Sequence, residues 1–287
     1  MPELRVDGDR VRFGERLAVS FHRTLRVPDD GRAYPLPAGL GRFPIVPMSV
    51  EGGAAQAVPM HPREAMWIGL SGAVWKPNAV KVLVGGINAV SGSPDDGGPP
   101  GMPQDYLVCP PQPWLDGFNA GDGAIRQFVA MELGAGYAVE AGHGLPERGG
   151  ITILAFEPVP GRFPDAPPPP GRGPVRLDLP RPPEVHEMAF GAGGRVRQKL
   201  YPDPHGGPAT WDAASAMRFT LRLVNARELA AHLGAPPFPT PIDASTYAAA
   251  GLPWFELDDG ASGHVRPAAG GPPRTIREVD VEREDSH

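Results

Sequence analysis

Apolar and polar residues alternate clearly between Leu17 and Val27. Successive side chains of an extended strand point to opposite faces, so a period of two gathers each class on one face. The apolar class comprises Leu17, Val19, Phe21, Leu25 and Val27, with Arg23 as the exception. The opposite face carries Ala18, Ser20, His22, Thr24 and Arg26. The run therefore predicts a strand with one buried face and one hydrated face.

Other apolar runs predict further strands, and they cover residues 65–70, 79–90, 106–109, 125–131 and 151–157. The run over 125–131 is also compatible with a short helix between Asp122 and Gly134, but its neighbours favour a strand. Glycine (38 residues) and proline (39 residues) separate the runs, with no Gly-X-Y period. Short apolar runs separated by glycine and proline are typical of short strands joined by turns. We expect a mainly β fold, an antiparallel β-sandwich or barrel with proline-rich straps and a smaller C-terminal α+β portion.

A proline-rich segment with four consecutive prolines divides the chain, and such a run favours an extended conformation. We expect a β-rich domain over 1–162, a linker or strap over 163–183, an α+β portion packed on the first domain over 184–258, and a polar tail over 259–287. Within the α+β portion, Asn225 and Glu228 have the spacing of a capping box, which predicts a helix over 226–233. The glycine-rich stretch 191–194 lacks the residues of a phosphate-binding loop and predicts a hairpin turn.

Charge and cysteine content narrow the class of protein. The net charge of −6 makes nucleic acid a poor partner. The single cysteine, Cys109, allows no internal disulfide and fits a reducing compartment. It follows an apolar run, so we expect a buried, inert thiol. No apolar run reaches the length of a membrane span or a signal peptide, so we expect a cytoplasmic protein.

Two stretches carry a resemblance: QDYLVCPPQPWLDGF at residues 104–118 and IRQFVAMELGAGYAVE at residues 125–140. With residues 23–45, 149–158 and 247–257, they are similar to an uncharacterised family of soluble proteins from bacteria and some fungi. The resemblance spans about residues 12–257. It implies no activity and no catalytic residue, but it implies that the two halves of the chain belong together.

The loop between the runs at 106–109 and 125–131 holds the densest candidate chemistry. Trp114 lies close to Asp116, Asn119 and Asp122 there. An aromatic side chain beside polar groups on a loop between strands is typical of a binding surface. The alternatives are that Trp114 plugs the loop onto the core, and that the polar residues form turns. We expect no metal site and no cofactor, because the histidines lack metal-ligand spacing and the chain has no nucleotide-binding motif.

Three functions follow as hypotheses. The first is a non-enzymatic binding or self-assembly protein whose strap, Pro28–Pro47, contributes to a homo-oligomer contact through Tyr34, Leu36 and Phe43. The second is a hydrolase of a small molecule or glycan, for which Asp116, Asp122 and His22 are the weak candidates. The third is a carbohydrate- or peptide-binding module that uses Trp114. The absence of a G-x-S-x-G or HExxH motif favours the first.

Overall fold

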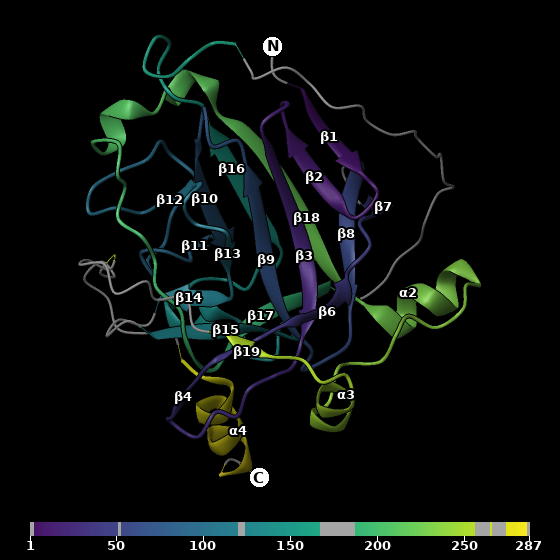
Figure 1. The fold of residues 1–287 in the computed structure, drawn as a ribbon. Coiled ribbons are helices and arrows are strands. Elements are labelled where there is room, and N and C mark those ends of the chain that lie inside the picture. Colours follow the sequence, from purple (N-terminus) through teal and green to yellow (C-terminus); the bar gives the residue numbers. More distant parts are fainter. Residues whose placement is uncertain are drawn as a thin grey trace.

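The computed structural model describes residues 3–50, 53–119, 124–166, 187–255, 265 and 274–285. Seventeen of the described strands join in one sheet, which is mainly antiparallel (Figure 1). They are β1 (Leu4–Asp7), β2 (Arg10–Phe13), β3 (Leu17–Thr24), β4 (Ala33–Tyr34), β6 (Gly39–Arg42), β7 (Val46–Val50), β8 (Gly53–Met60), β9 (Ala65–Gly72), β10 (Asn78–Val84), β11 (Ile87–Asn88), β12 (Leu107–Cys109), β13 (Trp114–Leu115), β14 (Gly117–Asn119), β15 (Ala124–Glu132), β16 (Ile151–Phe156), β17 (Glu187–Arg197) and β18 (Met217–Asn225). The expected mainly β fold is confirmed.

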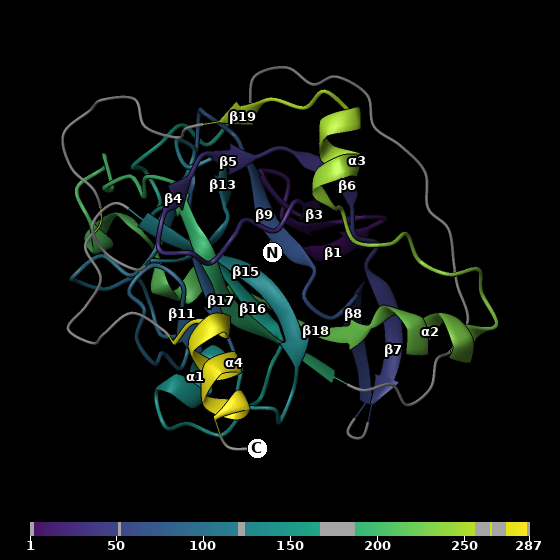
Figure 2. The same ribbon diagram turned by 90° about the horizontal axis from the view of Figure 1, so that it is seen from below.

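Two short strands and four α-helices complete the described structure. The strands β5 (Leu36–Pro37) and β19 (Trp254–Phe255) pair with each other, as Figure 2 shows. The helices are α1 (Val139–Gly142), α2 (Ala226–Leu233), α3 (Ala244–Ala249) and α4 (Ile276–Glu284), and there are two short 3₁₀ turns, Pro208–Thr210 and Ala213–Ser215.

The large sheet bends so that two of its parts enclose one core. The strands β2, β3 and β9 form one part, and β10, β16 and β18 belong to another. A single hydrophobic cluster contains Val19 and Ile68 from the first part and Val82, Ile153 and Leu221 from the second. The alternation along the chain therefore assigns the buried face of β3 correctly.

The strands of the expected α+β portion lie inside this same sheet. β17 pairs with β15 along most of its length, and β18 pairs with both β16 and β8. The helix predicted over 226–233 is present as α2. The side chain of Asn225 accepts hydrogen bonds from the N–H groups of Arg227 and Glu228, and Gly234 ends the helix in the left-handed conformation.

The hairpin turn expected at residues 191–194 is wrong, because these glycines lie within β17. Their missing side chains allow neighbouring segments to approach closely. A Cβ atom on Gly194 would lie 2.1 Å from the carbonyl oxygen of Pro28, and one on Gly191 would lie 2.8 Å from Cγ1 of Ile276. A glycine inside a strand marks such a close approach of another segment.

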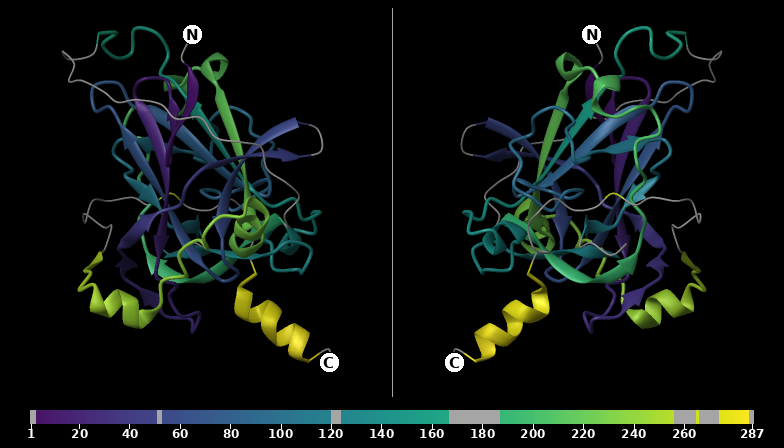
Figure 3. Two further views of the ribbon diagram at one scale, coloured as in Figure 1. Left: turned by 90° about the vertical axis from the view of Figure 1, so that its right-hand side faces the viewer. Right: turned by 90° about the vertical axis from the view of Figure 1, so that its left-hand side faces the viewer.

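Part of the expected polar tail is folded. Helix α4 begins with a capping box at Thr275, and its Ile276 and Val279 are buried. Figure 3 shows α4 projecting from the body of the sheet, with its first turn at the contact. The periodicity of this short helix is hidden in the sequence by its many charged residues, which are exposed on its outer side.

The strap and the cysteine pack inside the chain. Leu36 and Phe43 are 1% and 2% exposed. Cys109 is 1% exposed, as expected, and burial raises the pKa of its thiol to about 12.

Candidate functional site

A groove lies over β2, β3, β9 and β13, and two of its lining residues, Leu70 and Trp114, also pack against the main core. Ser20 on β3 is paired with Arg10 on β2 and with Gly69 on β9. Gly69 is in turn paired with Trp114 on β13. Side chains of directly opposed residues point to the same face, so Arg10, Ser20, Gly69 and Trp114 form one row across four strands.

A second row runs parallel to the first. His22 on β3 is paired with Trp67 on β9 and with Arg42 on β6. Both rows lie on the face of β3 that the sequence predicts to be hydrated. The two rows therefore bring two arginines, a histidine, a serine and two tryptophans together from five strands.

The aromatic side chains form a wall. The rings of His22 and Trp67 are stacked, with centroids 3.7 Å apart and an interplanar angle of 3°. The Trp114 ring lies 6.2 Å from Trp67 and is tilted by 55°. The backbone of Trp114 is fixed, because its carbonyl oxygen accepts hydrogen bonds from the side-chain amides of Gln112 (3.1 Å) and Gln198 (2.9 Å).

Two glycines make the space for this wall. A Cβ atom on Gly69 would lie 2.9 Å from both Ser20 Oγ and His22 Nε2, and one on Gly39 would lie 2.9 Å from Cζ2 of Trp67. The resulting cavity has a volume of about 250 Å³. Its lining residues are Arg10, Ala18, Ser20, His22, Arg42, Trp67, Gly69, Leu70, Ser71, Pro113 and Trp114.

The charged groups of the groove gather at one end, around β2 and β6. Arg42 Nη1 lies 2.9 Å from Asp9 Oδ2, and Arg10 Nε lies 3.7 Å from Asp9 Oδ1. Burial lowers the pKa of His22 to about 4, and the positive charge of Arg42 adds to this effect. His22 is therefore neutral at neutral pH.

The groove contains one pair of groups that resembles a nucleophile and its base. Ser20 Oγ and His22 Nε2 are 2.8 Å apart, which is within hydrogen-bond distance. A general base works best when its pKa is close to the working pH. A base with a pKa of about 4 holds a proton roughly a thousand times less tightly than one with a pKa near 7. The distance thus suits proton transfer, but the lowered pKa makes His22 a weak base.

The structure places two of the residues predicted from the sequence, His22 and Trp114, in the groove, and it places the buried Asp116 against the Trp114 side chain. Asp116 and Asn119 are each 1% exposed, so they do not lie on a contact surface. The side-chain amide of Asn119 donates hydrogen bonds to the carbonyl oxygens of Val90 and Val265. Asp122 lies outside the described residues. The expected exposed polar loop is thus corrected: its chain enters β14 and turns these side chains inward.

The strap residues offered as a subunit contact are also corrected. Leu36 and Phe43 belong to the main hydrophobic core of their own chain, and Tyr34 packs partly against it. The Tyr34 hydroxyl donates a hydrogen bond to Asp30 at 2.7 Å. These side chains therefore make most of their contacts within their own chain.

Sequence reasoning missed several residues of the groove, namely Arg10, Ser20, Arg42, Trp67 and Gly69. A signal for Trp67 and Gly69 was present, because Met66, Ile68 and Leu70 alternate with them and point to the core. The alternation shows that Trp67 and Gly69 share the hydrated face. It does not show which strands lie beside them.

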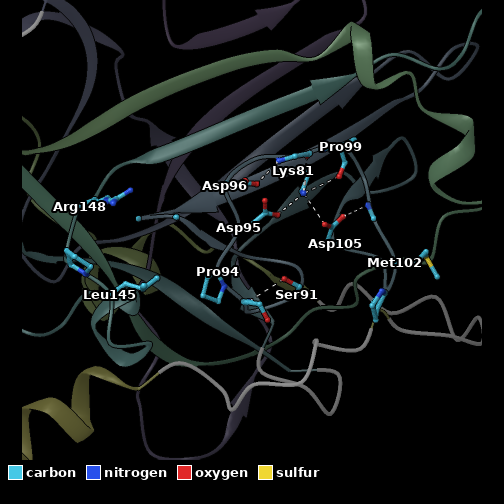
Figure 4. A pocket seen from close by; sticks show the side chains of 17 residues that line it. Lys81, Ser91, Pro94, Asp95, Asp96, Pro99, Met102, Asp105, Leu145 and Arg148 are labelled. Carbon is cyan, nitrogen blue, oxygen red and sulfur yellow. Dashed lines mark hydrogen bonds and ion pairs between the residues drawn. The ribbon is translucent and has the colours of Figure 1, made fainter.

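A larger cavity, of about 690 Å³, lies beside the loop over residues 91–105 (Figure 4). Its centre is Lys81, which is 2% exposed and lies 2.7 Å from Asp95 Oδ2 and 2.9 Å from Asp105 Oδ2. Asn88 Nδ2 donates a further hydrogen bond to Asp95 at 2.8 Å. Lys81 thus pairs with both carboxylates, and this cluster fastens the loop to the outer face of β10. One ammonium and two carboxylates leave one negative charge at its centre.

Two other features are absent from the described ranges, namely a metal-ligating cluster and a membrane-spanning helix. No three or more His, Cys, Asp or Glu side chains in that part of the chain are grouped so as to hold a metal ion. None of the described helices is long and apolar enough to cross a membrane. No protein-family model, curated protein or solved structure matches the chain.

Proposed function

We propose that this protein is a non-enzymatic binding protein that holds a sugar ring in the groove formed by His22, Trp67 and Trp114. The observation that carries the proposal is the aromatic wall beside polar side chains. A sugar ring has an apolar face of C–H groups and a rim of hydroxyl groups. Aromatic rings pack against the apolar face, and side chains such as Ser20 and Ser71 form hydrogen bonds with the hydroxyl groups.

The size of the cavity supports a small ligand or one unit of a longer one. Pockets for drug-sized molecules are typically about 300–1,000 Å³, and this cavity is about 250 Å³. The packing of Trp114 against the core also supports binding, because a side chain that is already in place loses little freedom when the ligand arrives.

A titration followed by tryptophan fluorescence tests the proposal. The probes are a set of neutral and acidic trisaccharides, and the test variant is Trp114→Ala. We expect at least one probe to bind, and we expect the substitution to weaken binding by about thirtyfold, since a truncated aromatic anchor costs on the order of 2 kcal/mol.

Trp254→Ala is the matched control. Trp254 is 44% exposed and packs against Tyr247, and it does not line the groove. The control should bind as the unaltered protein does. If no trisaccharide binds, or if Trp114→Ala binds as tightly as the unaltered protein, the groove is not a sugar site.

A further inference from the structure

The groove carries an excess of positive charge in a chain whose net charge is −6. Among the described residues that line the cavity, two are arginines and none has a carboxylate. Both arginines pair with the same carboxylate, that of Asp9. Two guanidinium groups and one carboxylate leave one positive charge at this end of the groove.

The pKa of His22 indicates the same excess of positive charge. The positive charge of Arg42 lowers the pKa of His22 more than the negative charge of Asp9 raises it, and Arg10 lowers it further. The imidazole therefore lies in a net positive field. A ligand with a negative group would be attracted to this region, and it would relieve the repulsion between the two arginines.

The two arginines and Trp114 occupy opposite ends of the groove, with His22 and Trp67 between them. Arg10 and Arg42 lie on β2 and β6, both of which border the same side of β3. Trp114 lies on β13, beyond β9. Neighbouring strands are about 4.8 Å apart, so the row from Arg10 to Trp114 spans three intervals, or about 14 Å of backbone. One sugar ring does not fill that distance, but a chain of two or three rings does.

We infer that the ligand of the groove is a short acidic sugar chain, with one ring against Trp114 and a carboxylate of a neighbouring uronate ring at Arg10 and Arg42. The planar fork of a guanidinium group fits a carboxylate through two parallel hydrogen bonds. This inference rests on the proposed function and adds the charge and the length of the ligand to it.

The test compares each acidic sugar with its own neutral form. The probes are trisaccharides of galacturonate, glucuronate and mannuronate, each beside its methyl ester, which keeps the rings and removes the charge. Calorimetry at low and at high NaCl gives the dissociation constants. We expect at least one acid to bind about tenfold tighter than its ester at low salt, and we expect the difference to shrink as salt screens the charges.

Arg42→Gln separates charge from stacking. Arg42 is exposed, so its replacement leaves the core intact. We expect this variant to bind the acid about threefold more weakly, as is typical of an exposed ion pair, and to bind the ester as before. Arg32→Gln is the control, because the Arg32 side chain is 82% exposed and lies outside the groove, and it should change neither constant.

The outcomes distinguish the two claims. If an ester binds as tightly as its acid and Arg42→Gln changes nothing, the acidic ligand is wrong while the sugar site stands. If Arg42→Gln weakens the acid and the ester equally, the arginine acts through the fold and the inference fails. If neither form of any probe binds, the proposed function fails and the inference falls with it.

Discussion

The carboxyl group of Asp116 is expected to make the stability of the protein depend on pH. Asp116 lies between β13 and β14 and is 1% exposed. Apart from the nearby Trp114 side chain, neither of its side-chain oxygens has a hydrogen-bond partner among the described residues. Burial raises the pKa of Asp116 from 3.8 to about 8, although the Trp114 side chain partly offsets the shift. The group is therefore protonated in the folded protein at neutral pH.

The sign of the effect follows from linkage. In the unfolded chain the carboxyl releases its proton near pH 4, whereas the folded protein keeps it up to about pH 8. Raising the pH through this window therefore favours the unfolded state, by about 1.4 kcal/mol for each unit. Over the whole window the loss is on the order of 5 kcal/mol, which is a large part of the stability of an ordinary domain.

Urea unfolding at several pH values, with Asp116→Asn as the variant, measures this loss. The lowered pKa of His22 acts in the opposite direction between about pH 4 and 6.5, where stability falls as the pH is lowered. The clearest window is therefore pH 6.5 to 8. There the unaltered protein should lose stability as pH rises, and Asp116→Asn should be nearly flat and several kcal/mol more stable at pH 8.

Asp285→Asn is the control, because Asp285 is exposed at the end of α4, and it should follow the unaltered protein. Two results would refute the reasoning. One is an unaltered protein whose unfolding free energy does not change between pH 6.5 and 8. The other is a variant that is less stable than the unaltered protein at pH 8, since that would require a partner for the ionised carboxylate.

Three further changes test other parts of the structure. Gly69→Ala places a methyl group 2.9 Å from His22 Nε2 and Ser20 Oγ, so sugar binding should fall by about tenfold or more and urea unfolding should lose about 1–3 kcal/mol; unchanged binding would contradict the groove. Arg23→Ala removes the partner of the buried Glu64 and should cost about 3–5 kcal/mol in urea unfolding, whereas a loss below about 1 kcal/mol would show that the pair is hydrated. Phe43→Ser should lower the melting temperature in a thermal scan rather than dissociate an oligomer, because the ring is 2% exposed in its own chain; a folded variant of reduced sedimentation coefficient would restore the assembly hypothesis.

Local patterns in the sequence predict the strands well because each pattern is read within a few residues. The alternation from Leu17 to Val27 locates β3 and its buried face, and the run over 151–157 locates β16. The cap at Asn225 likewise defines the start of α2. These features depend on side-chain periodicity and on hydrogen bonds between near neighbours.

Contacts between segments that are distant in the sequence are predicted poorly. The glycines of 191–194 look like a turn, and only the arrival of Pro28 and Ile276 explains them as part of a strand. Asp116 looks like a surface carboxylate beside Trp114, and only the pairing of β14 with β15 turns it inward. In each case the deciding contact lies many residues away in the chain, so composition and spacing give no information on it.

The groove is the strongest case of this kind. Alternation places His22 on the hydrated face of one strand and Trp67 on the hydrated face of another. It does not show that these two strands are neighbours or that the two residues lie opposite each other. The register of β3 against β9 places the two rings directly opposite each other, and a shift of one residue would turn Trp67 toward the core. The chemistry of the site is thus a property of the register, and substitutions that alter the register should abolish sugar binding even when every groove residue is retained.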